Sequence, residues 1–296
     1  MTFRAVRADK TDAGQTVRFV DMEHADLMDG DVTIRVTHST VNYKDGLALS
    51  GKSAIIRSFP MVLGVDLAGI VETSGRPDFA PGDEVILTGH GLGETHFGGY
   101  AERARVNGDW LVKLPPGLTR AEAMAIGTAG FTAMLALIAL EQAGLEPSSG
   151  PALVTGAAGG VGSMAISLLA DKGWTVVAST GRLAETGYLK SLGAAEVIDR
   201  ATLSAPGRPL GKERWAAAVD SVGSTTLANA LAQTRYGGAV AACGLAGAWT
   251  CRRRSRRSSC AACRSWGSRA SIAQAHAGSR RGGGSPPTST APSSRR

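Results

Sequence analysis

Cysteine is nearly absent from most of this 296-residue chain: only Cys243 lies before residue 248, whereas Cys251, Cys260 and Cys263 follow it. The first 247 residues therefore contain neither a disulfide framework nor the four cysteines of a zinc-binding lobe. The Cys260-x-x-Cys263 pair has the spacing of a zinc knuckle together with Cys251 and His276. Few apolar residues surround it, so we expect no metal there.

Lysine and acidic residues are missing from residues 248–296, which carry eleven arginines. The net charge of +7 therefore comes from this end, and the preceding 247 residues are mildly acidic. A basic chain often binds nucleic acid, but this distribution makes such a partner unexpected for the folded part. No uninterrupted apolar run of 18 residues and no apolar leader occur, so we expect no membrane span and a cytoplasmic location.

A glycine-rich turn follows the apolar run 152–154 and precedes a segment with helical periodicity, after which a second apolar run covers 174–178. Glycine lets a backbone turn approach a pyrophosphate closely, and the helix N-terminus adds partial positive charge. The spacing is G-x-x-G-G-x-G, but its place in a strand-turn-helix-strand unit predicts a dinucleotide site. The predicted contacts are Gly156, Gly159, Gly160, Val161 and Gly162.

The end of the second apolar run indicates which dinucleotide binds. It reads Ser179-Thr180-Gly181-Arg182, without the carboxylate that usually accepts a hydrogen bond from the ribose of NAD. Arg182 could pair with a 2′-phosphate, and Ser179 and Thr180 could hydrogen-bond to it. The sequence therefore predicts NADPH as cofactor.

The two halves of the chain have different periodicities. Residues 1–125 alternate between apolar and polar positions over short strands with turns between them, as in a small β-barrel. Residues 126–247 alternate helix and strand, as in a doubly wound parallel sheet. A helical segment over 121–143, interrupted near Gly127, joins the halves. We predict an α/β protein with a barrel-like domain, a Rossmann domain and an unstructured or incomplete tail over 248–296.

Several motifs, among them VNYKDGLALSG, PMVLGVDLAGIVE, VTGAAGGVGS, VDSVG and CGLAG, resemble those of the medium-chain dehydrogenase/reductase superfamily. The similarity is to its zinc-free, quinone-oxidoreductase-like branch, and within it to NADPH-dependent acrylyl-CoA reductases. The resemblance implies a GroES-like domain over 1–125. Zinc members have Cys where this chain has Asn42 and Gly-His-Glu where it has Gly64-Val65-Asp66, so the resemblance also implies that no metal is used.

This resemblance implies that NADPH delivers hydride to a 2-enoyl-CoA such as acrylyl-CoA, giving propanoyl-CoA. Tyr43 is then the candidate for contacting nicotinamide and substrate, and also a candidate proton donor, and Asp66 orients its neighbours. Both can also be read as structural, and the alternatives are a quinone or enone reductase, a non-catalytic NADPH-binding protein and a nucleic-acid binder acting through its tail. Further cofactor contacts are expected from Thr128, Arg200 and Leu245.

The tail after Gly247 does not resemble this family. Codons that fit Ala248–Cys251 permit Met-Asp-Leu in another frame, and those of Ser258–Cys263 permit Phe-Ile-Leu-Arg-Gly-Val. We therefore hypothesise a frameshift near codon 248, which sequencing of the locus would test. The family implies a homodimer. We expect a chain with this tail to leave its dimer edge and apolar sheet faces uncovered, and an inactive polypeptide is one alternative that this leaves open.

Overall fold

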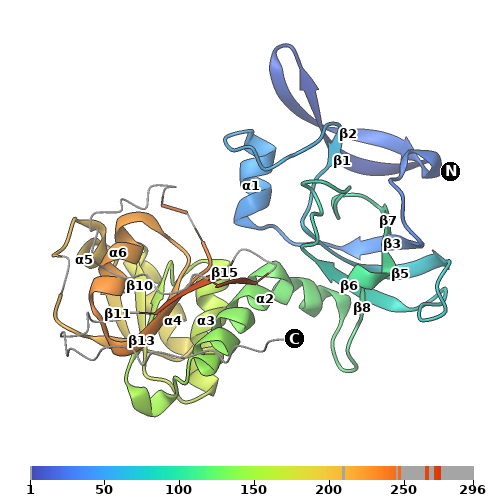
Figure 1. Ribbon diagram of the computed structural model, residues 1–296. Coiled ribbons are helices and arrows are strands. Elements are labelled where there is room, and N and C mark those ends of the chain that lie inside the picture. Colours follow the sequence, from blue (N-terminus) through green and yellow to red (C-terminus); the bar gives the residue numbers. More distant parts are fainter. Residues whose placement is uncertain (1, 209–210, 245, 248–263, 267–269, 275–296) are drawn as a thin grey trace, which may run out of the picture.

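The computed structural model describes residues 2–208, 211–244, 246–247, 264–266 and 270–274. Two lobes are visible in Figure 1, and the helix α2 (Arg120–Gln142) runs from one to the other. The predicted α/β architecture, with antiparallel sheets first and a parallel sheet second, is confirmed. The described part of the predicted tail consists of two short strands, and its other residues lie outside the description.

The first lobe contains two antiparallel sheets joined by an isolated bridge between Ala5 and Ala101. Alternating residues are buried at the start of the strand Thr2–Thr11 and in the strand Arg103–Val106, as the period of two predicts, whereas Val32, Thr33 and Ile34 are buried in succession. Two short helical turns, η1 (His24–Asp26) and η2 (Gly108–Trp110), connect strands. The helix α1 (Tyr43–Ser50) packs against the strands Thr2–Thr11 and Met61–Val62, since Ala48 lies in one apolar cluster with Ala8 and Met61. One sheet contains β2 (Gly14–Glu23), β1 (Thr2–Thr11) and β4 (Met61–Val62), and the other β7 (Arg103–Val106), β3 (Val32–His38), β5 (Asp66–Ser74), β6 (Glu84–Thr88) and β8 (Val112–Lys113).

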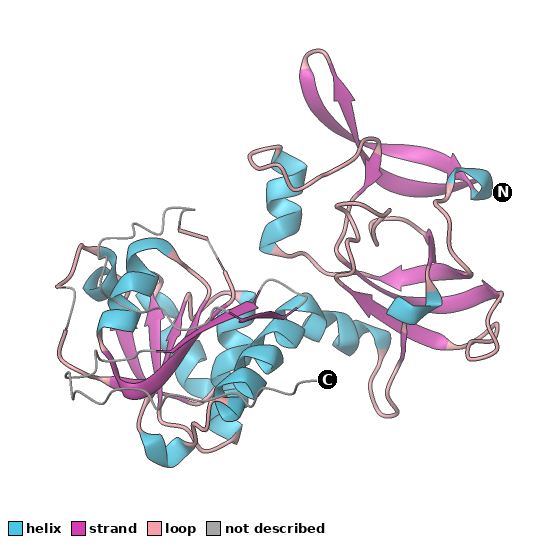
Figure 2. Ribbon diagram, viewed as in Figure 1, coloured by secondary structure: helices cyan, strands magenta, loops and turns pink. Residues whose placement is uncertain are grey.

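The second lobe is a seven-stranded sheet in the order β11-β10-β9-β12-β13-β15-β14, and Figure 2 shows helices around it. The first five of these strands are parallel, and the order reverses between β9 and β12. Ligands of such sheets bind outside the carboxyl ends of the strands at this reversal. The strands are β9 (Ala152–Thr155), β10 (Val176–Thr180), β11 (Ala194–Asp199), β12 (Trp215–Asp220) and β13 (Thr234–Ala242), and the helices α3 (Gly160–Asp171), η3 (Pro147–Ser149), η4 (Leu183–Glu185), α4 (Thr186–Ser191), α5 (Ala201–Ser204) and α6 (Ser224–Ala232).

The edge of this sheet beside β13 differs from the expected open edge. β15 (Ala270–Gln274) pairs antiparallel with β13, and β14 (Arg264–Trp266) pairs with β15. An unpaired strand exposes a row of N–H and C=O groups, and any short extended segment can satisfy them. The expectation of an uncovered edge is therefore wrong at β13, although the dimer edge of the family is not tested by this pairing.

The connecting helix α2 carries the interruption that the sequence predicts. Gly127 has φ 45° and ψ −158° inside the helix, a conformation that favours glycine. A Cβ at this position would lie 2.8 Å from Thr40 Cγ2 and 3.2 Å from an Asp66 carboxylate oxygen. The kink therefore brings α2 against the first lobe, and it leaves no room for another residue type.

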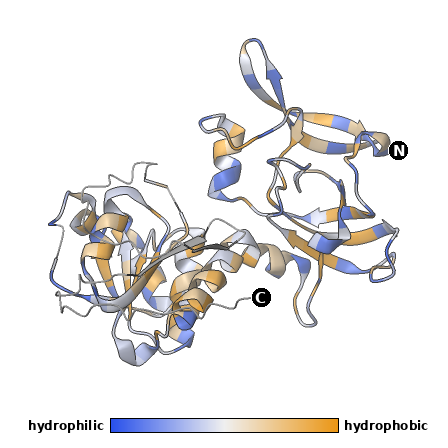
Figure 3. Cartoon of the chain, in the orientation of Figure 1, coloured by the Kyte–Doolittle hydropathy of each residue, from blue (hydrophilic) through white to orange (hydrophobic). Residues whose placement is uncertain are grey.

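By length and composition alone, α2 is the one helix of the described residues that could cross a membrane, because its best 18-residue window has a mean hydropathy of 2.0. A core helix passes the same test, and 44% of that window is buried. Ala133, Leu137 and Leu140 belong to the largest apolar cluster of the second lobe. Apolar residues occur along the whole length of α2, as Figure 3 shows.

An exposed apolar face on α2, formed by Phe131, Met134 and Ile138, predicts aggregation. Replacing all three by Gln should suppress aggregation while changing the free energy of unfolding by no more than about 1.5 kcal/mol, because each substitution of an exposed side chain costs about 0.5 kcal/mol or less. Light scattering and thermal unfolding measure the two effects. Leu137→Gln is the control, because it buries an unpaired amide and should destabilise by about 3 kcal/mol. Unchanged aggregation of the triple variant would contradict this prediction.

Candidate active site

The glycine turn lies where the sequence predicts it, between β9 and α3. Gly156 has φ 61°, and a Cβ there would clash with Ser221 Oγ. The Gly159 N–H donates to Gly156 O at 2.8 Å, and a Cβ on Gly162 would clash with the same carbonyl oxygen. Gly159 is the N-cap of α3, and no side chain caps this end. The N–H groups of the first helical turn, from Gly160, Val161 and Gly162, are therefore available to an anion.

The predicted 2′-phosphate residues lie together at the carboxyl end of β10. Ser179 is 1% exposed, and its hydroxyl has no hydrogen-bond partner among the residues that the structure describes. Thr180 Oγ1 accepts a hydrogen bond from the Arg182 N–H at 3.0 Å. A buried hydroxyl without a partner is uncommon in a folded protein, so this position is suited to a ligand with acceptor oxygens.

Two guanidinium groups flank this strand end. The backbone N–H of Arg200 donates to Thr180 O at 2.9 Å, and a Cβ on Gly181 would lie 2.5 Å from Arg200 Nε. The Arg182 guanidinium donates to Ala158 O and lies 3.2 Å from Glu185 Oε1. The two cations and the Ser179 hydroxyl fit a phosphorylated ribose. To bind its phosphate, the Arg182 guanidinium would replace its contact with Glu185 by one with the phosphate.

Asp66 is the centre of a buried polar network between the lobes. Its carboxylate is 0% exposed, and Asn42 Nδ2 donates to it at 2.7 Å. Thr128, next to the α2 kink, donates its backbone N–H at 3.1 Å and its hydroxyl at 2.5 Å. Burial raises the pKa of Asp66, while these hydrogen bonds oppose the rise. The geometry makes Asp66 an acceptor that holds α2, and its orienting role in the reaction stays a prediction.

Asn42 also bears on the question of a metal ion. Its amide donates a hydrogen bond to Asp66. Asn42 and Asp66 occupy the positions at which the zinc members have the Cys and the Gly-His-Glu motif. An Asn nitrogen is not among the sulfur, imidazole and carboxylate ligands that bind zinc. Over the residues that the structure describes, no group of three or more His, Cys, Asp or Glu side chains could hold a metal ion. These residues therefore do not fit a zinc ion.

Tyr43, at the start of α1, is the predicted residue that reaches the other lobe. Its side chain is exposed, and its hydroxyl donates to Ala246 O at 3.5 Å. Ala246 follows Leu245, a predicted cofactor contact that lies outside the described residues. The loop 243–247 thus places a contact from the second lobe beside the aromatic ring of the first.

Sequence reasoning missed three polar residues near these groups: Asp45 and Asp220, which are buried, and Tyr100, which is half-buried. Asp45 accepts hydrogen bonds from the N–H groups of Asn42 at 2.8 Å and Val65 at 3.1 Å. Tyr100 donates its hydroxyl to Thr40 O at 3.0 Å, and burial raises its pKa. Asp220 ends β12 and is fully buried. Asn42-x-x-Asp45 has the spacing of a helix cap, which is a usable signal, whereas the other two depend on contacts distant in sequence.

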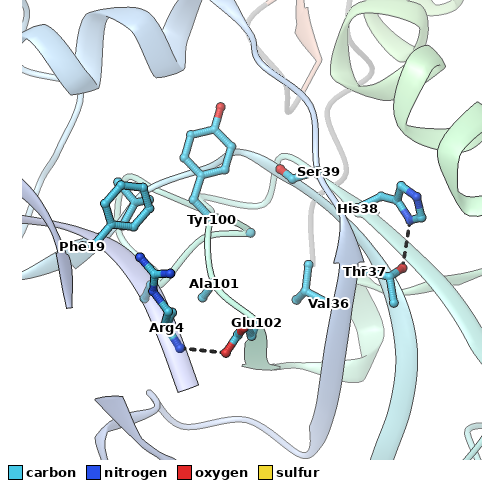
Figure 4. Close-up of a pocket in the computed structure, with 12 residues that line it drawn as sticks. Arg4, Phe19, Val36, Thr37, His38, Ser39, Tyr100, Ala101 and Glu102 are labelled. Carbon is cyan, nitrogen blue, oxygen red and sulfur yellow. Dashed lines mark hydrogen bonds between the residues drawn. The ribbon is translucent and has the colours of Figure 1, made fainter. Parts of the chain in front are cut away.

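A hollow of about 510 Å³ lies within the first lobe, and the predicted site residues do not line it. Figure 4 shows Tyr100 among the residues that line this hollow, with the Arg4 N–H donating to Glu102, at 2.9 Å, and Thr37 beside His38. Ser39, also at the wall, donates its hydroxyl to Asp66 O at 2.7 Å. The hollow therefore adjoins the Asp66 network without containing the glycine turn.

Comparison with known proteins finds two family matches. Residues 28–116 match the "Alcohol dehydrogenase GroES-like domain" and residues 160–257 the "Zinc-binding dehydrogenase" family. The chain is 56% identical over 238 residues, 80% of this chain and 73% of the relative, to the Escherichia coli K12 protein named "Probable acrylyl-CoA reductase AcuI". It is 48% identical over 250 residues, 83% of this chain and 74% of the relative, to the Bacillus subtilis "Putative quinone oxidoreductase YhfP".

A solved structure of a related protein has the same fold. The crystal structure of Escherichia coli K-12 YhdH with bound NADPH superimposes with a TM-score of 0.81 at 53% identity. The match covers 83% of this chain and 76% of that one. Both lobes are therefore shared with a protein that was crystallised with this dinucleotide.

Proposed function

This chain belongs to the medium-chain dehydrogenase/reductase superfamily, in its quinone-oxidoreductase-like branch, and we propose that it uses NADPH to reduce an activated C=C bond. The proposed substrate is a 2-enoyl-CoA such as acrylyl-CoA, with propanoyl-CoA as product. The observation that carries the proposal is the position of Tyr43, whose hydroxyl contacts Ala246 in a loop that packs on the turn 220–223, which in turn packs on the glycine turn. A reductase needs its dinucleotide and its substrate residues to meet in this way.

The cofactor is held by groups already placed for it. The N–H groups at the start of α3 would hold the pyrophosphate, and Gly156, Gly159 and Gly162 would leave room for it. Ser179, Thr180, Arg182 and Arg200 would hold the 2′-phosphate. When bound, NADPH supplies a hydride to the β-carbon of the enoyl thioester, and the α-carbon takes a proton.

The substrate side is organised by the first lobe. Tyr43 contacts the nicotinamide and substrate, and its hydroxyl is the candidate proton donor. Asp66 acts through Thr128, because its carboxylate holds both the N–H and the hydroxyl of that residue beside the kink. Thr128 would thereby be held in a fixed position for a contact with the cofactor, and Asp66 is a positioning residue.

Substrate choice is tested by comparing turnover with acrylyl-CoA and with quinones. NADPH oxidation is followed at 340 nm for the chain as it stands and for a version with one nucleotide restored at codon 248. We expect the specificity constant for acrylyl-CoA to exceed that for quinones. Absence of turnover with every activated alkene in the restored version would overturn the proposal.

A second candidate is reduction of quinones or other enones. It is favoured by the 48% identity to a relative named as a putative quinone oxidoreductase. Both reactions deliver hydride to an unsaturated carbon system conjugated with a carbonyl, so the same residues serve either one. A higher specificity constant for a quinone in the assay above would select this candidate. In both cases we propose a small-molecule substrate and a cytoplasmic enzyme without a nucleic-acid partner.

Cofactor preference gives a residue-level test. Arg182→Ala and Ser179→Ala should each raise the Kd for NADPH about tenfold or more, because a charge-assisted bond to phosphate contributes about 1.5–3 kcal/mol. The Kd for NADH should stay within about twofold, since NADH lacks the phosphate. Fluorescence titration with both dinucleotides measures this, with the exposed cation variant Lys172→Ala as control. Equal weakening of NADH and NADPH would contradict the assignment.

A further inference from the structure

The carboxylate of Asp220 is fully buried, and the proposed reaction does not use it. Thr155 Oγ1 donates to it at 2.6 Å and the Gly223 N–H at 2.8 Å, and its own carbonyl oxygen accepts from the Cys243 N–H at 2.8 Å. Thr155 ends β9 and Cys243 follows β13, so one residue joins three adjacent strands at their carboxyl ends. Burial raises the pKa of Asp220. Burying a carboxylate is costly, and hydrophobic packing would stabilise this position at least as well.

The place of this residue is specific. β9 and β12 are the neighbouring strands between which the order of the sheet reverses, where dinucleotides bind in such folds. Ser221, next to Asp220, donates its hydroxyl to Thr155 O at 3.0 Å. A Cβ on Gly156 would clash with that same hydroxyl. The turn 220–223 is therefore packed directly against the glycine turn.

The other side of the turn 220–223 faces the loop 243–247. The Gly247 N–H donates to Val222 O at 2.7 Å, and a Cβ on Gly244 would lie 2.8 Å from the Ser221 carbonyl carbon. Ala246 in this loop is the residue that Tyr43 contacts. The turn is thus a spacer between the glycine turn, which holds the pyrophosphate end, and the loop that meets Tyr43.

We propose that Asp220 is a positioning residue for hydride transfer: by clamping Thr155, it sets the distance between the glycine turn and the loop 243–247, and so the place of the nicotinamide relative to Tyr43. This inference rests on the proposed function, because it assigns the clamp to a bound nicotinamide dinucleotide. Both carboxylate oxygens are used as acceptors. An Asn side chain has only one acceptor oxygen, so Asp220→Asn keeps the shape but loses one of the two contacts.

Turnover separates positioning from a purely structural role. Asp220→Asn and Thr155→Val should lower kcat at least tenfold while the KM for acrylyl-CoA changes by less than about threefold, and Thr155→Ser should retain activity because it keeps the hydroxyl. Asn229→Ala is the matched control. Asn229 is buried in the same lobe, and its side chain donates to Leu203 O and Ala205 O. Among the described residues, its side chain makes no hydrogen bond to the turn 220–223. It should lose stability and keep kcat. If Asp220→Asn and Thr155→Val also lose only stability, the inference is overturned.

Thiol labelling tests the clamp without turnover. In a background with Cys251→Ser, Cys260→Ser and Cys263→Ser, Cys243 is the remaining thiol, and its Sγ donates to Asp220 O at 3.4 Å. Burial and the Asp220 charge raise its pKa to about 12. NADPH should slow labelling of Cys243 by a thiol reagent severalfold, and Asp220→Asn should abolish this protection. Retained protection in Asp220→Asn would contradict the clamp, whereas NADPH protection without turnover of any alkene would contradict only the proposed function.

Discussion

Gly162→Ala should raise the Kd for NADPH at least tenfold, although it adds a single methyl group. A Cβ at this position would clash with Gly156 O and lie 2.7 Å from Ala157 Cα and 2.8 Å from Ala157 O. All three are backbone atoms of the glycine turn, so no side-chain rotation can relieve the contact. The turn must move away from α3, and its N–H groups then no longer converge on the pyrophosphate.

Gly187→Ala is the matched control for this variant. Gly187 also lies in a helix, α4, and a Cβ there meets no atom within 4 Å. Because alanine favours helix over glycine by up to about 1 kcal/mol, this control should keep the Kd and unfold at a slightly higher temperature. Fluorescence titration and thermal unfolding of both variants measure the contrast. Equal NADPH affinity in Gly162→Ala and the wild type would show that this turn does not hold the dinucleotide.

Asp66→Ala should lower kcat/KM about a hundredfold and the free energy of unfolding by about 3 kcal/mol. The substitution leaves the Thr128 N–H and hydroxyl and the Asn42 amide without their acceptor in a buried site, and each lost partner costs about 1–3 kcal/mol. Thr128 then loses its fixed position beside the kink of α2. Steady-state kinetics and chemical unfolding measure the two losses.

The neighbouring hydroxyl provides a coupling test for Asp66. In a double-mutant cycle with Thr128→Val, the two substitutions should be far from additive, because they remove the same contact. Asp78→Ala, which removes an exposed partner of Arg76, is the control and should leave kcat/KM within about twofold. Additive effects of Asp66→Ala and Thr128→Val on kcat/KM would contradict the positioning role of Asp66.

Periodic features of the chain were predictable because they depend on local spacing. The interruption of α2 at Gly127 and the glycine turn before α3 both follow from apolar periodicity and glycine placement. The helix α1 was not predicted, since its eight residues include Gly46 and show little apolar periodicity. Its signal is the cap formed by Asn42 and Asp45 rather than a stripe of apolar residues.

The polar connections between distant residues were the least predictable part of the site. Asp66 and Thr128 lie 62 residues apart, and Asp220 and Thr155 lie 65 apart, so only the fold brings them together. The conformation of residues 98–102 also depends on a distant partner. Ala101 forms an isolated β-bridge with Ala5, and the regular strand begins only at Arg103. A residue's type indicates what it can bond, but its partner depends on the packing of both lobes.

Deuterium transfer is the most direct measurement of the central claim, that this chain carries an NADPH-dependent enoyl-thioester reductase site. NADPH with deuterium at both C4 positions is incubated with acrylyl-CoA and the chain, as it stands and with the reading frame restored at codon 248, and the product is analysed by mass spectrometry. The account predicts propanoyl-CoA with one deuterium on its terminal carbon, formed by the restored chain and formed several-fold more slowly by Gly162→Ala when NADPH is below saturation. Propanoyl-CoA without deuterium, or no product in the restored chain, would contradict it.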